Sequence, residues 1–562
     1  MVATTPQSRE CSAMAVTVTL NARATPVDPG ATLFAAATAA GISVPSSCRQ
    51  QGKCRECLVE VTSGGDLLTP RTREELHLRA GFRLSCRCGI AEGAETGAVT
   101  AHTLLRATLR VEDRAVNLPP SVHGRAHDPA VTRSGDAILI DGVEVARGPG
   151  PLLGVAIDLG TTTVALRVID LESARTVAAA SFENPQRFGG TDVMARIQYD
   201  TDHPGRLLQR TLFAYLTRVI QGLPVDPASI FEYVIAGNST MRDLAFGLDV
   251  RSIGQKPYRS LIEQAWRDGL RPNSSVVARA RDLRLPGHPQ ARVYGLPLVS
   301  GHVGADAAAC LLALEPHHRD ELIAIMDLGT NTELFMGNRH KLLAASCPAG
   351  PAFEGGAITC GMPGLSGAIE RVWLDDGGGV RIRVIGDSAP EGICGSGLID
   401  LLGEMLRTGR MNERGRFESG DDSFVVDAKH QILFRESDVN ELAQAKGANV
   451  AGLQIVAKRY GRSLAELDRF YLAGGFGRHL DLDATRRIGL IPDLPDEKIV
   501  AVGNLAIEGA SIALLSQSRR RELETVVGTI GHVELETDPD FFDHFVTGCQ
   551  FHPVGANQQA TP

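Results

Sequence analysis

The order of apolar and polar positions near the start of the chain predicts short strands around one helix. AVTVTLNARATPV, from residue 15, alternates apolar and polar residues, which predicts two strands joined by a turn. ATLFAAATAAG (31–41) predicts an alanine-rich helix that ends at Gly41. LVEV (58–61) and GFRLSCRC (81–88) predict later strands, and TPRTREELHLRAG between them predicts a polar helix. We assign these elements to one domain at 15–95, after a flexible N-terminus at 1–14.

A different pattern begins near residue 154, where buried strands are separated by tight turns that contain glycine. GVAID and TVALRVID flank the turn LGTT, which predicts a strand hairpin over 154–170. AIMDLGTNT (324–332) repeats the start of this hairpin in altered form. The recurrence predicts an internal duplication, with halves at 151–322 and 323–550 and a flexible tail at 551–562.

Small residues mark two further elements of the duplicated region. VGADAAACLLAL (303–314) and GNLAIEGASIALLS (503–516) predict helices that could cross closely. YLAGGFGRHLD (471–481) predicts a strand followed by a Gly-Gly turn. Residues 96–150 contain Pro and Gly breaks and a few short alternating runs, and we expect a small linker domain, or part linker and part strand pair.

Composition narrows the possible functions. The chain has 562 residues, which is more than one hydrophobic core can hold. Its contents of 43% apolar and 22% charged residues are ordinary for a globular protein. A net charge of −9 without a long basic run argues against a nucleic-acid partner. No apolar run reaches the roughly 18–20 residues that span a bilayer, and the N-terminus MVATTPQSRE lacks the features of a secretory signal. We therefore expect a cytoplasmic protein without a membrane partner.

Five of the eleven cysteines lie between residues 48 and 88. The first three have the spacing C-x5-C-x2-C, one residue longer than the plant-type 2Fe–2S loop, and a distant fourth cysteine follows. This spacing and the preceding order of strands and helix predict a β-grasp ferredoxin domain whose 2Fe–2S cluster is bound by Cys48, Cys54, Cys57 and Cys86. Cys88 competes with Cys86 for the fourth position. A zinc site formed by Cys54, Cys57, Cys86 and Cys88 is the alternative, although it leaves Cys48 unexplained.

The turns of the two hairpins predict a phosphate-binding site. Successive backbone N–H groups in such a turn point toward an anion, so the candidate nucleotide ligands are Gly160, Thr161, Thr162, Gly329, Thr330 and Asn331. Asp158 ends the first strand and would face the same space, where it could hold Mg²⁺ through water. Two similar hairpins can hold one nucleotide from opposite sides. The chain has no Walker A motif, G-x-x-x-x-G-K-[ST], which removes the commonest rival ATP site.

In order, these blocks resemble the phosphate-1, connect-1, phosphate-2, adenosine and connect-2 motifs of the actin, sugar-kinase and heat-shock-chaperone ATPase superfamily. The resemblance implies a duplicated ribonuclease-H-like, or actin-like, ATPase fold, which makes the chain a multidomain α+β and α/β protein. It implies that Asp158 and Asp327 face each other across a cleft near the metal, and that Asp306 orients attacking water. These three are the candidate catalytic residues. The predicted contacts with the base and ribose of ATP are Gly474, Gly475 and Gly477.

Five further blocks are ENPQRFGGTDVMARI (183–197), IAGNSTM (235–241), CPAGPAFEGGAITCGM (347–362), EGICGSGLIDLL (391–402) and ESDVNELAQAKGA (436–448). With them the chain resembles the reductive activators of corrinoid proteins over about residues 15–550. The resemblance implies an ATP-hydrolysing redox activator that passes one electron from its 2Fe–2S cluster to the cob(II)alamin of a corrinoid protein in a methyltransferase system, restoring cob(I)alamin. It also implies an external low-potential electron donor and a homodimer.

Three other functions fit parts of the pattern. One is a small-molecule kinase with a redox-sensing cluster, although no acceptor pocket can be argued from the sequence. Another is a binding module whose assembly with a partner is gated by the nucleotide. The last is an activator of a different low-potential enzyme, such as a dehydratase, whose relatives carry a 4Fe–4S cluster between subunits instead of a fused ferredoxin domain.

Overall fold

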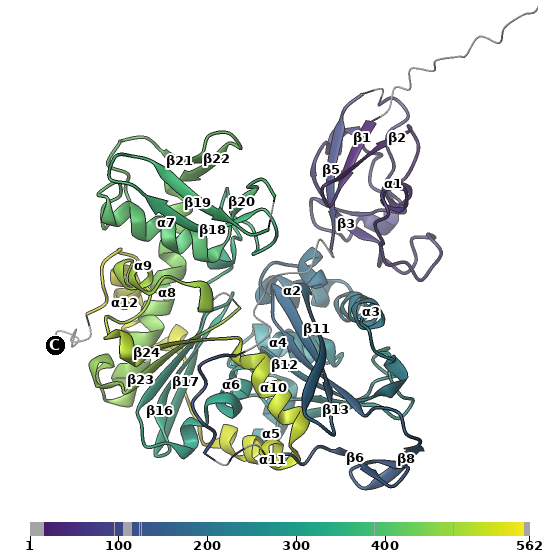
Figure 1. Ribbon diagram of the computed structural model, residues 1–562, viewed down its shortest axis with the longest axis vertical. Coiled ribbons are helices and arrows are strands. Elements are labelled where there is room, and N and C mark those ends of the chain that lie inside the picture. Colours follow the sequence, from purple (N-terminus) through teal and green to yellow (C-terminus); the bar gives the residue numbers. More distant parts are fainter. Residues whose placement is uncertain are drawn as a thin grey trace, which may run out of the picture. The chain divides into compact units, whose positions relative to one another are not determined.

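The computed structural model describes residues 16–94, 96–104, 115–122, 124, 126–386, 388–475 and 477–555. The chain divides into two compact units, an N-terminal unit (Met1–Arg106) and a C-terminal unit (Ala107–Pro562) (Figure 1). The flexible N-terminus predicted at 1–14 lies outside the described residues. Among the residues that are described, no helix is both long and apolar enough to cross a bilayer.

The N-terminal unit contains a five-stranded sheet in the order β2-β1-β5-β3-β4. Its elements are β1 (Val16–Leu20), β2 (Arg23–Val27), α1 (Leu33–Ala39), β3 (Leu58–Ser63), β4 (Phe82–Leu84) and β5 (Ala98–Thr103). The hydroxyl of Thr32 begins α1 by accepting a hydrogen bond from the Ala35 N–H at 3.1 Å. The apolar face of α1 is buried through Leu33, Ala36 and Ala37. This mixed sheet with one packed helix is the predicted β-grasp arrangement.

Two sequence predictions for this unit need correction. The polar helix expected over 69–81 is reduced to a short 3₁₀ helix, η2 (Arg73–Glu75). Its residues are held by side-chain contacts instead: Glu75 is fully buried and pairs with Arg83 at 2.9 Å, and Arg71 donates to the carbonyl of Leu78 at 2.6 Å. The domain also continues past residue 95, because β5 pairs with both β1 and β3.

The region predicted as a linker contributes to the C-terminal unit. A three-stranded antiparallel sheet contains β6 (Val131–Ser134), β7 (Ala137–Ile140) and β8 (Val143–Arg147). Just before it, Asp128 accepts a hydrogen bond from the Ser518 N–H at 2.9 Å. The tail predicted to be flexible from residue 551 is packed over its described part, since Phe551 is 2% exposed and Val554 pairs with Pro492.

Two six-stranded sheets confirm the predicted duplication. The first has the order β11-β10-β9-β12-β14-β13 and the second β24-β23-β15-β16-β17-β25. In each, an antiparallel meander of three strands is extended by two strands parallel to its first member, β12 and β14 in the first sheet and β23 and β24 in the second. The sixth strand is β13, antiparallel to β14, in the first sheet and β25, parallel to β17, in the second. The bounds are β9 (Leu153–Leu159), β10 (Thr163–Asp170), β11 (Arg175–Glu183), β12 (Ile230–Gly237), β13 (Val276–Arg279), β14 (Arg292–Gly295), β15 (Ile323–Asp327), β16 (Thr332–Asn338), β17 (Lys341–Cys347), β23 (Arg469–Ala473), β24 (Ile499–Gly503) and β25 (Gly531–His532).

Helices α6 (Ala305–Leu314) and α10 (Leu505–Leu515) are the two helices rich in small residues, and they cross in close contact. A Cβ atom added at Gly509 would lie 2.0 Å from the carbonyl oxygen of Ala309, so this crossing requires glycine. The remaining helices are α2 (Val193–Asp202), α3 (Leu207–Gln221), α4 (Ser239–Ala245), α5 (Leu261–Arg267), α7 (Gly395–Arg407), α8 (Glu436–Tyr460), α9 (Leu482–Arg487), α11 (Gln517–Val526) and α12 (Phe541–Gly548).

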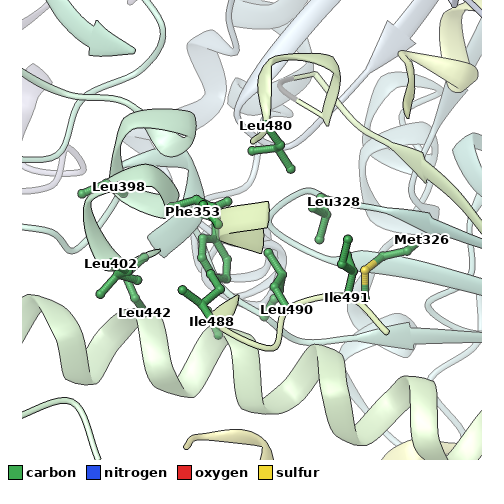
Figure 2. Packing of buried hydrophobic residues seen from close by; sticks show 14 of the residues in the cluster. Met326, Leu328, Phe353, Leu398, Leu402, Leu442, Leu480, Ile488, Leu490 and Ile491 are labelled. Carbon is green, nitrogen blue, oxygen red and sulfur yellow. The ribbon is translucent and has the colours of Figure 1, made fainter. Parts of the chain in front are cut away.

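The second half carries an added layer with two small sheets and a large apolar core. The strands are β18 (Ala368–Leu374), β19 (Val380–Val384), β20 (Gly392–Ile393), β21 (Ser423–Asp427) and β22 (Ile432–Arg435). Figure 2 shows Leu398 and Leu402 of α7 and Leu442 of α8 packed around Phe353, beside Ile488 and Leu490. This packing fixes α7 and α8 against the second sheet, whose hairpin forms one wall of the site described next.

Candidate functional site

The predicted cluster cysteines lie in the N-terminal unit as two pairs of thiols. The Sγ atoms of Cys57 and Cys86 are 3.2 Å apart, and the thiols of Cys48 and Cys54 hydrogen-bond each other. Each iron of a 2Fe–2S cluster takes two protein thiolates. The paired arrangement of four sulfurs therefore fits this cofactor.

Backbone N–H groups around the cysteine loop favour thiolates. Burial raises the pKa of Cys48, but hydrogen bonds from the backbone of Cys54, Gln51 and Lys53 bring it down to about 7. The pKa of Cys86 is also lowered to about 7, by the thiol of Cys57 and, against the effect of burial, by the backbone of Gly52. Donors of this kind also serve the sulfides of an iron–sulfur cluster.

Cys88 has a different environment. Its side chain is 0% exposed, and burial raises its pKa to about 12. Its N–H and C=O are occupied by backbone hydrogen bonds to Leu84 and Leu33, which hold it beneath α1 as a small apolar residue. Burial alone does not distinguish it, since the predicted ligand Cys57 is also 0% exposed. The pairing of the Cys86 and Cys57 sulfurs at 3.2 Å is what supports Cys86 as the fourth ligand.

The candidate nucleotide site is a cleft in the C-terminal unit, where the two hairpin turns meet. The Oγ1 atoms of Thr162 and Thr330 are 3.0 Å apart. Both hydroxyls donate to the same carboxylate oxygen of Glu354, that of Thr162 at 2.7 Å. The cleft is lined by all of the predicted nucleotide contacts except Gly477: Gly160, Thr161, Thr162, Gly329, Thr330, Asn331, Gly474 and Gly475. Gly477 instead begins the short 3₁₀ helix η9 (Gly477–His479).

Besides Glu354 and Glu370, four carboxylates line the same cleft. The three predicted ones, Asp158, Asp306 and Asp327, are joined by Glu333. Burial raises the pKa of Asp158 to about 7 and that of Asp327 to about 6. For Asp306, burial and the charges of Asp158 and Asp327 raise the pKa to about 7, and burial with the charges of Asp306 and Asp327 raises that of Glu333. Carboxylate oxygens that line one cleft are the type of ligand that a hard cation such as Mg²⁺ prefers.

Neighbouring side chains hold the first turn and its aspartate in place. Asn504, just before α10, donates to Asp158 Oδ2 at 2.7 Å. Asn238 donates to the hydroxyl of Thr161 at 3.0 Å, and the buried guanidinium of Arg196 donates to the carbonyl of Thr161 at 2.6 Å. These contacts orient the turn whose backbone N–H groups would meet phosphate oxygens.

The sequence prediction missed Glu333 and Glu354. Glu333 interrupts the apolar strand TELFMG, at the position where the first hairpin has Val164, and a charge inside an otherwise buried strand was the available signal. Glu354 lies in a glycine-rich run, far in sequence from the threonines that it contacts. No spacing rule connects it to the hairpins.

Comparison with known proteins accounts for nearly the whole chain. A model of 2Fe–2S iron–sulfur cluster binding domains matches residues 16–91. Models of the middle region of RACo and of its C-terminal ASKHA domain match residues 153–319 and 321–561.

Individual relatives agree with these matches. The corrinoid activation enzyme RamQ of Eubacterium limosum is 32% identical over 444 residues, which cover 74% of this chain and 72% of the relative. A [Co(II) methylated amine-specific corrinoid protein] reductase of Methanosarcina barkeri is 23% identical over 432 residues, covering 72% and 78%. The solved structure of a reductive activator for corrinoid, iron–sulfur protein superposes with a TM-score of 0.70 at 26% identity and covers 96% of this chain and 98% of its own. The predicted resemblance is thus confirmed, and the chain belongs to the family of reductive activators of corrinoid proteins.

Proposed function

We propose that this protein restores inactive corrinoid proteins by passing one electron from its 2Fe–2S cluster to cob(II)alamin, with ATP hydrolysis driving the step. The observation that carries the proposal is the presence, in one chain, of two thiol pairs suited to a 2Fe–2S cluster and of a cleft where two phosphate-binding turns meet. A cluster of this type supplies an electron near −400 mV. Reduction to cob(I)alamin needs a lower potential, and each ~59 mV of shortfall costs a factor of ten for one electron.

The contact of Glu354 with both hairpins suggests how nucleotide binding changes the cleft. The carboxylate of Glu354 accepts hydrogen bonds from Thr162 and Thr330. Phosphate oxygens entering between the two turns would be repelled by this carboxylate and would compete for the same hydroxyls. We infer that ATP separates Glu354 from the turns, so that the glycine-rich loop at 347–356 moves relative to the hairpins.

The roles of the site residues follow from their positions. The cluster would be held by Cys48, Cys54, Cys57 and Cys86. The turns at 160–162 and 329–331 would bind the phosphates through backbone N–H groups, and Gly474 and Gly475 would border the base and ribose. Asp158 would hold Mg²⁺ through water, with Asp306 and Asp327 orienting water and metal for phosphoryl transfer.

The partners follow from the same proposal. The target is a corrinoid protein of a methyltransferase system, and an external low-potential donor refills the cluster. A homodimer and a cytoplasmic location remain predictions from the sequence.

Binding of Mg²⁺ should weaken as the pH falls from about 8 to about 6. The pKa values of Asp158 and Asp306 near 7 mean that protons compete with the metal in this range, at about tenfold in affinity per pH unit for each carboxylate protonated. The measurement is the Mg²⁺-induced shift in thermal unfolding temperature at several pH values. In metal-free protein the same raised pKa values stabilise the fold at low pH, and this stabilisation is lost as the pH rises toward 7. A Mg²⁺ shift that is the same at pH 6 and pH 8 would count against a carboxylate site.

The test of the function is anaerobic spectroscopy. Pre-reduced protein is mixed with a cob(II)alamin-loaded corrinoid subunit of a methyltransferase, with and without ATP and Mg²⁺. We expect the cob(I)alamin absorption to rise only when ATP is present, and ATP hydrolysis to increase when the corrinoid protein is added. Cob(I)alamin that forms equally without ATP would refute the coupling. No reduction with any corrinoid subunit tested would refute the function.

A further inference from the structure

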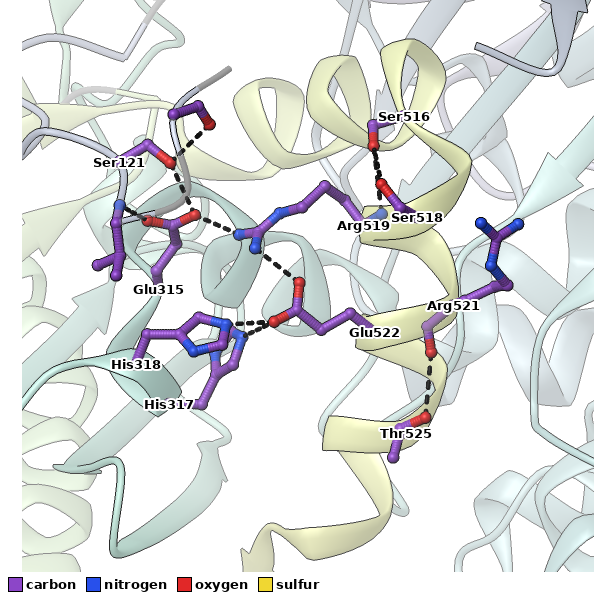
Figure 3. Close-up of polar contacts among 12 residues, drawn as sticks. Ser121, Glu315, His317, His318, Ser516, Ser518, Arg519, Arg521, Glu522 and Thr525 are labelled. Atoms are coloured by element: carbon purple, nitrogen blue, oxygen red, sulfur yellow. Dashed lines mark hydrogen bonds and ion pairs between the residues drawn. The ribbon is translucent and has the colours of Figure 1, made fainter. Parts of the chain in front are cut away.

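Two adjacent histidines and a glutamate converge away from the nucleotide cleft. His317 and His318 form the 3₁₀ helix η6 (Pro316–His318), which follows α6, and Glu522 lies on α11. Figure 3 shows both imidazoles directed at the carboxylate of Glu522. The Nε2 atom of His317 is 3.1 Å from Glu522 Oε1, and Nε2 of His318 contacts the same oxygen. The three ligand atoms lie within 4.8 Å of one another.

The three side chains differ in how far they are buried. The side chain of His317 is 9% exposed, while those of His318 and Glu522 are 25% and 24% exposed. The group therefore lies at the edge of the packed unit, where an ion could enter from solvent and where imidazole nitrogens, the commonest protein ligands for transition metals, are accessible.

The carboxylate is also oriented for this role. Arg519, one turn earlier on α11, donates to Glu522 Oε2 at 2.6 Å, and its other terminal nitrogen contacts Glu315. The hydrogen bond from Arg519 occupies Oε2 of Glu522, and Oε1 of the same carboxylate faces the two imidazoles (Figure 3). Partners of this kind fix the direction of metal ligands in known sites.

We propose that His317, His318 and Glu522 bind a divalent transition-metal ion, with Zn²⁺ as the ion that fits best. Two imidazole nitrogens and one carboxylate oxygen form a donor set found in zinc sites, and it leaves a fourth position for water. Bonds of about 2.0–2.1 Å to a tetrahedral ion place ligand atoms about 3.3 Å apart, close to the 3.1 Å between His317 and Glu522. Hard cations such as Mg²⁺ and Ca²⁺ prefer oxygen ligands and are not expected here.

A metal at this position would connect η6 to α11, and these elements follow the two helices, α6 and α10, that contribute Asp306 and Ala506 to the lining of the nucleotide cleft. Helix α6 carries Asp306 and leads into His317 and His318, while α11 follows directly after α10. Because α6 and α10 cross at Gly509, a tie between η6 and α11 should stabilise their packing. This inference does not depend on the proposed corrinoid chemistry.

The experiment is a titration of cluster-loaded protein with Zn²⁺, followed by X-ray absorption at the zinc edge. We expect about one equivalent of zinc beyond the cluster, with imidazole and oxygen scattering and no sulfur, and a higher thermal unfolding temperature. His318→Gln and Glu522→Gln, on different elements, should each weaken binding by at least about tenfold. His340→Gln is the matched control, because this histidine is 68% exposed and pairs only loosely with Asp320, at 3.6 Å.

Each other result would overturn the proposal. Absence of stoichiometric zinc would show that the two histidines only hydrogen-bond to Glu522. Sulfur scattering would place the ion at the cysteines. Unchanged affinity in folded His318→Gln and Glu522→Gln proteins, with folding checked by circular dichroism and nucleotide binding, would place it elsewhere.

Discussion

Replacing Cys86 with alanine is expected to abolish retention of the 2Fe–2S cluster, whereas replacing Cys88 with alanine should leave it in place. Cys86 lies 3.2 Å from Cys57 and receives a hydrogen bond from the backbone of Gly52, while Cys88 is packed under α1 with its pKa raised by burial. The measurement is iron and acid-labile sulfide per chain, which should be about two of each in the wild type and in Cys88→Ala. The visible absorption of the cluster should follow the same pattern.

Cys88→Ala serves as the matched control for this experiment. This substitution removes a buried thiol only two residues from Cys86. It should lower the free energy of unfolding by about 1 kcal/mol at most, because a free buried cysteine behaves as a small apolar residue. Nucleotide binding should be normal in both variants, since the described residues that line the cleft belong to the C-terminal unit. If Cys88→Ala loses the cluster and Cys86→Ala keeps it, the fourth ligand has been misassigned. If the wild type holds zinc in place of iron and each variant loses it, the alternative zinc site, which uses both cysteines, is correct.

The hairpins and crossing helices could be predicted because their signals are local. A strand, a glycine turn and an aspartate fit within ten residues, and the recurrence of Asp158-Leu-Gly-Thr as Asp327-Leu-Gly-Thr identified the two walls of one cleft. Small residues likewise predicted close packing of α6 and α10. A Cβ atom added at Gly509 would lie 2.0 Å from the carbonyl oxygen of Ala309, so this packing requires glycine there. The helix that the local sequence pattern predicts over 69–81 is wrong, because the ion pair of Glu75 with Arg83 holds this segment without a regular helix.

Contacts between distant segments could not be predicted. Glu354 meets Thr162 across 192 residues of sequence, and Glu522 meets His317 across 205. Each of these glutamates has an ordinary local sequence, and its chemistry appears only when the fold brings it beside its partners. The packed chain end at Phe551 was missed for the same reason, because its backbone pairs with the distant Glu413.

Asp327→Asn is expected to lower the rate of ATP hydrolysis by about 10²-fold or more while leaving the cluster content unchanged. The substitution keeps the size of the side chain and removes one of the charges that would compensate metal and phosphate in the cleft, an electrostatic contribution that commonly has this magnitude. Asp376→Asn is the control, since this aspartate is 93% exposed in its side chain. Steady-state phosphate release in the two variants is the measurement.

Thermal unfolding separates a functional loss from a structural one. Burial, and after it the charge of Asp327, raises the pKa values of Asp158, Asp306 and Glu333, so the carboxylate of Asp327 is repelled by its neighbours when no metal is bound. Removing it should leave the unfolding temperature of the metal-free protein unchanged or higher, although its hydrogen bond from Cys310, at 3.4 Å, is weakened. A variant that hydrolyses ATP normally would remove Asp327 from the site. A variant that loses both activity and stability would show that the carboxylate of Asp327 supports the fold. The catalytic role would then be assigned to the neighbouring carboxylates.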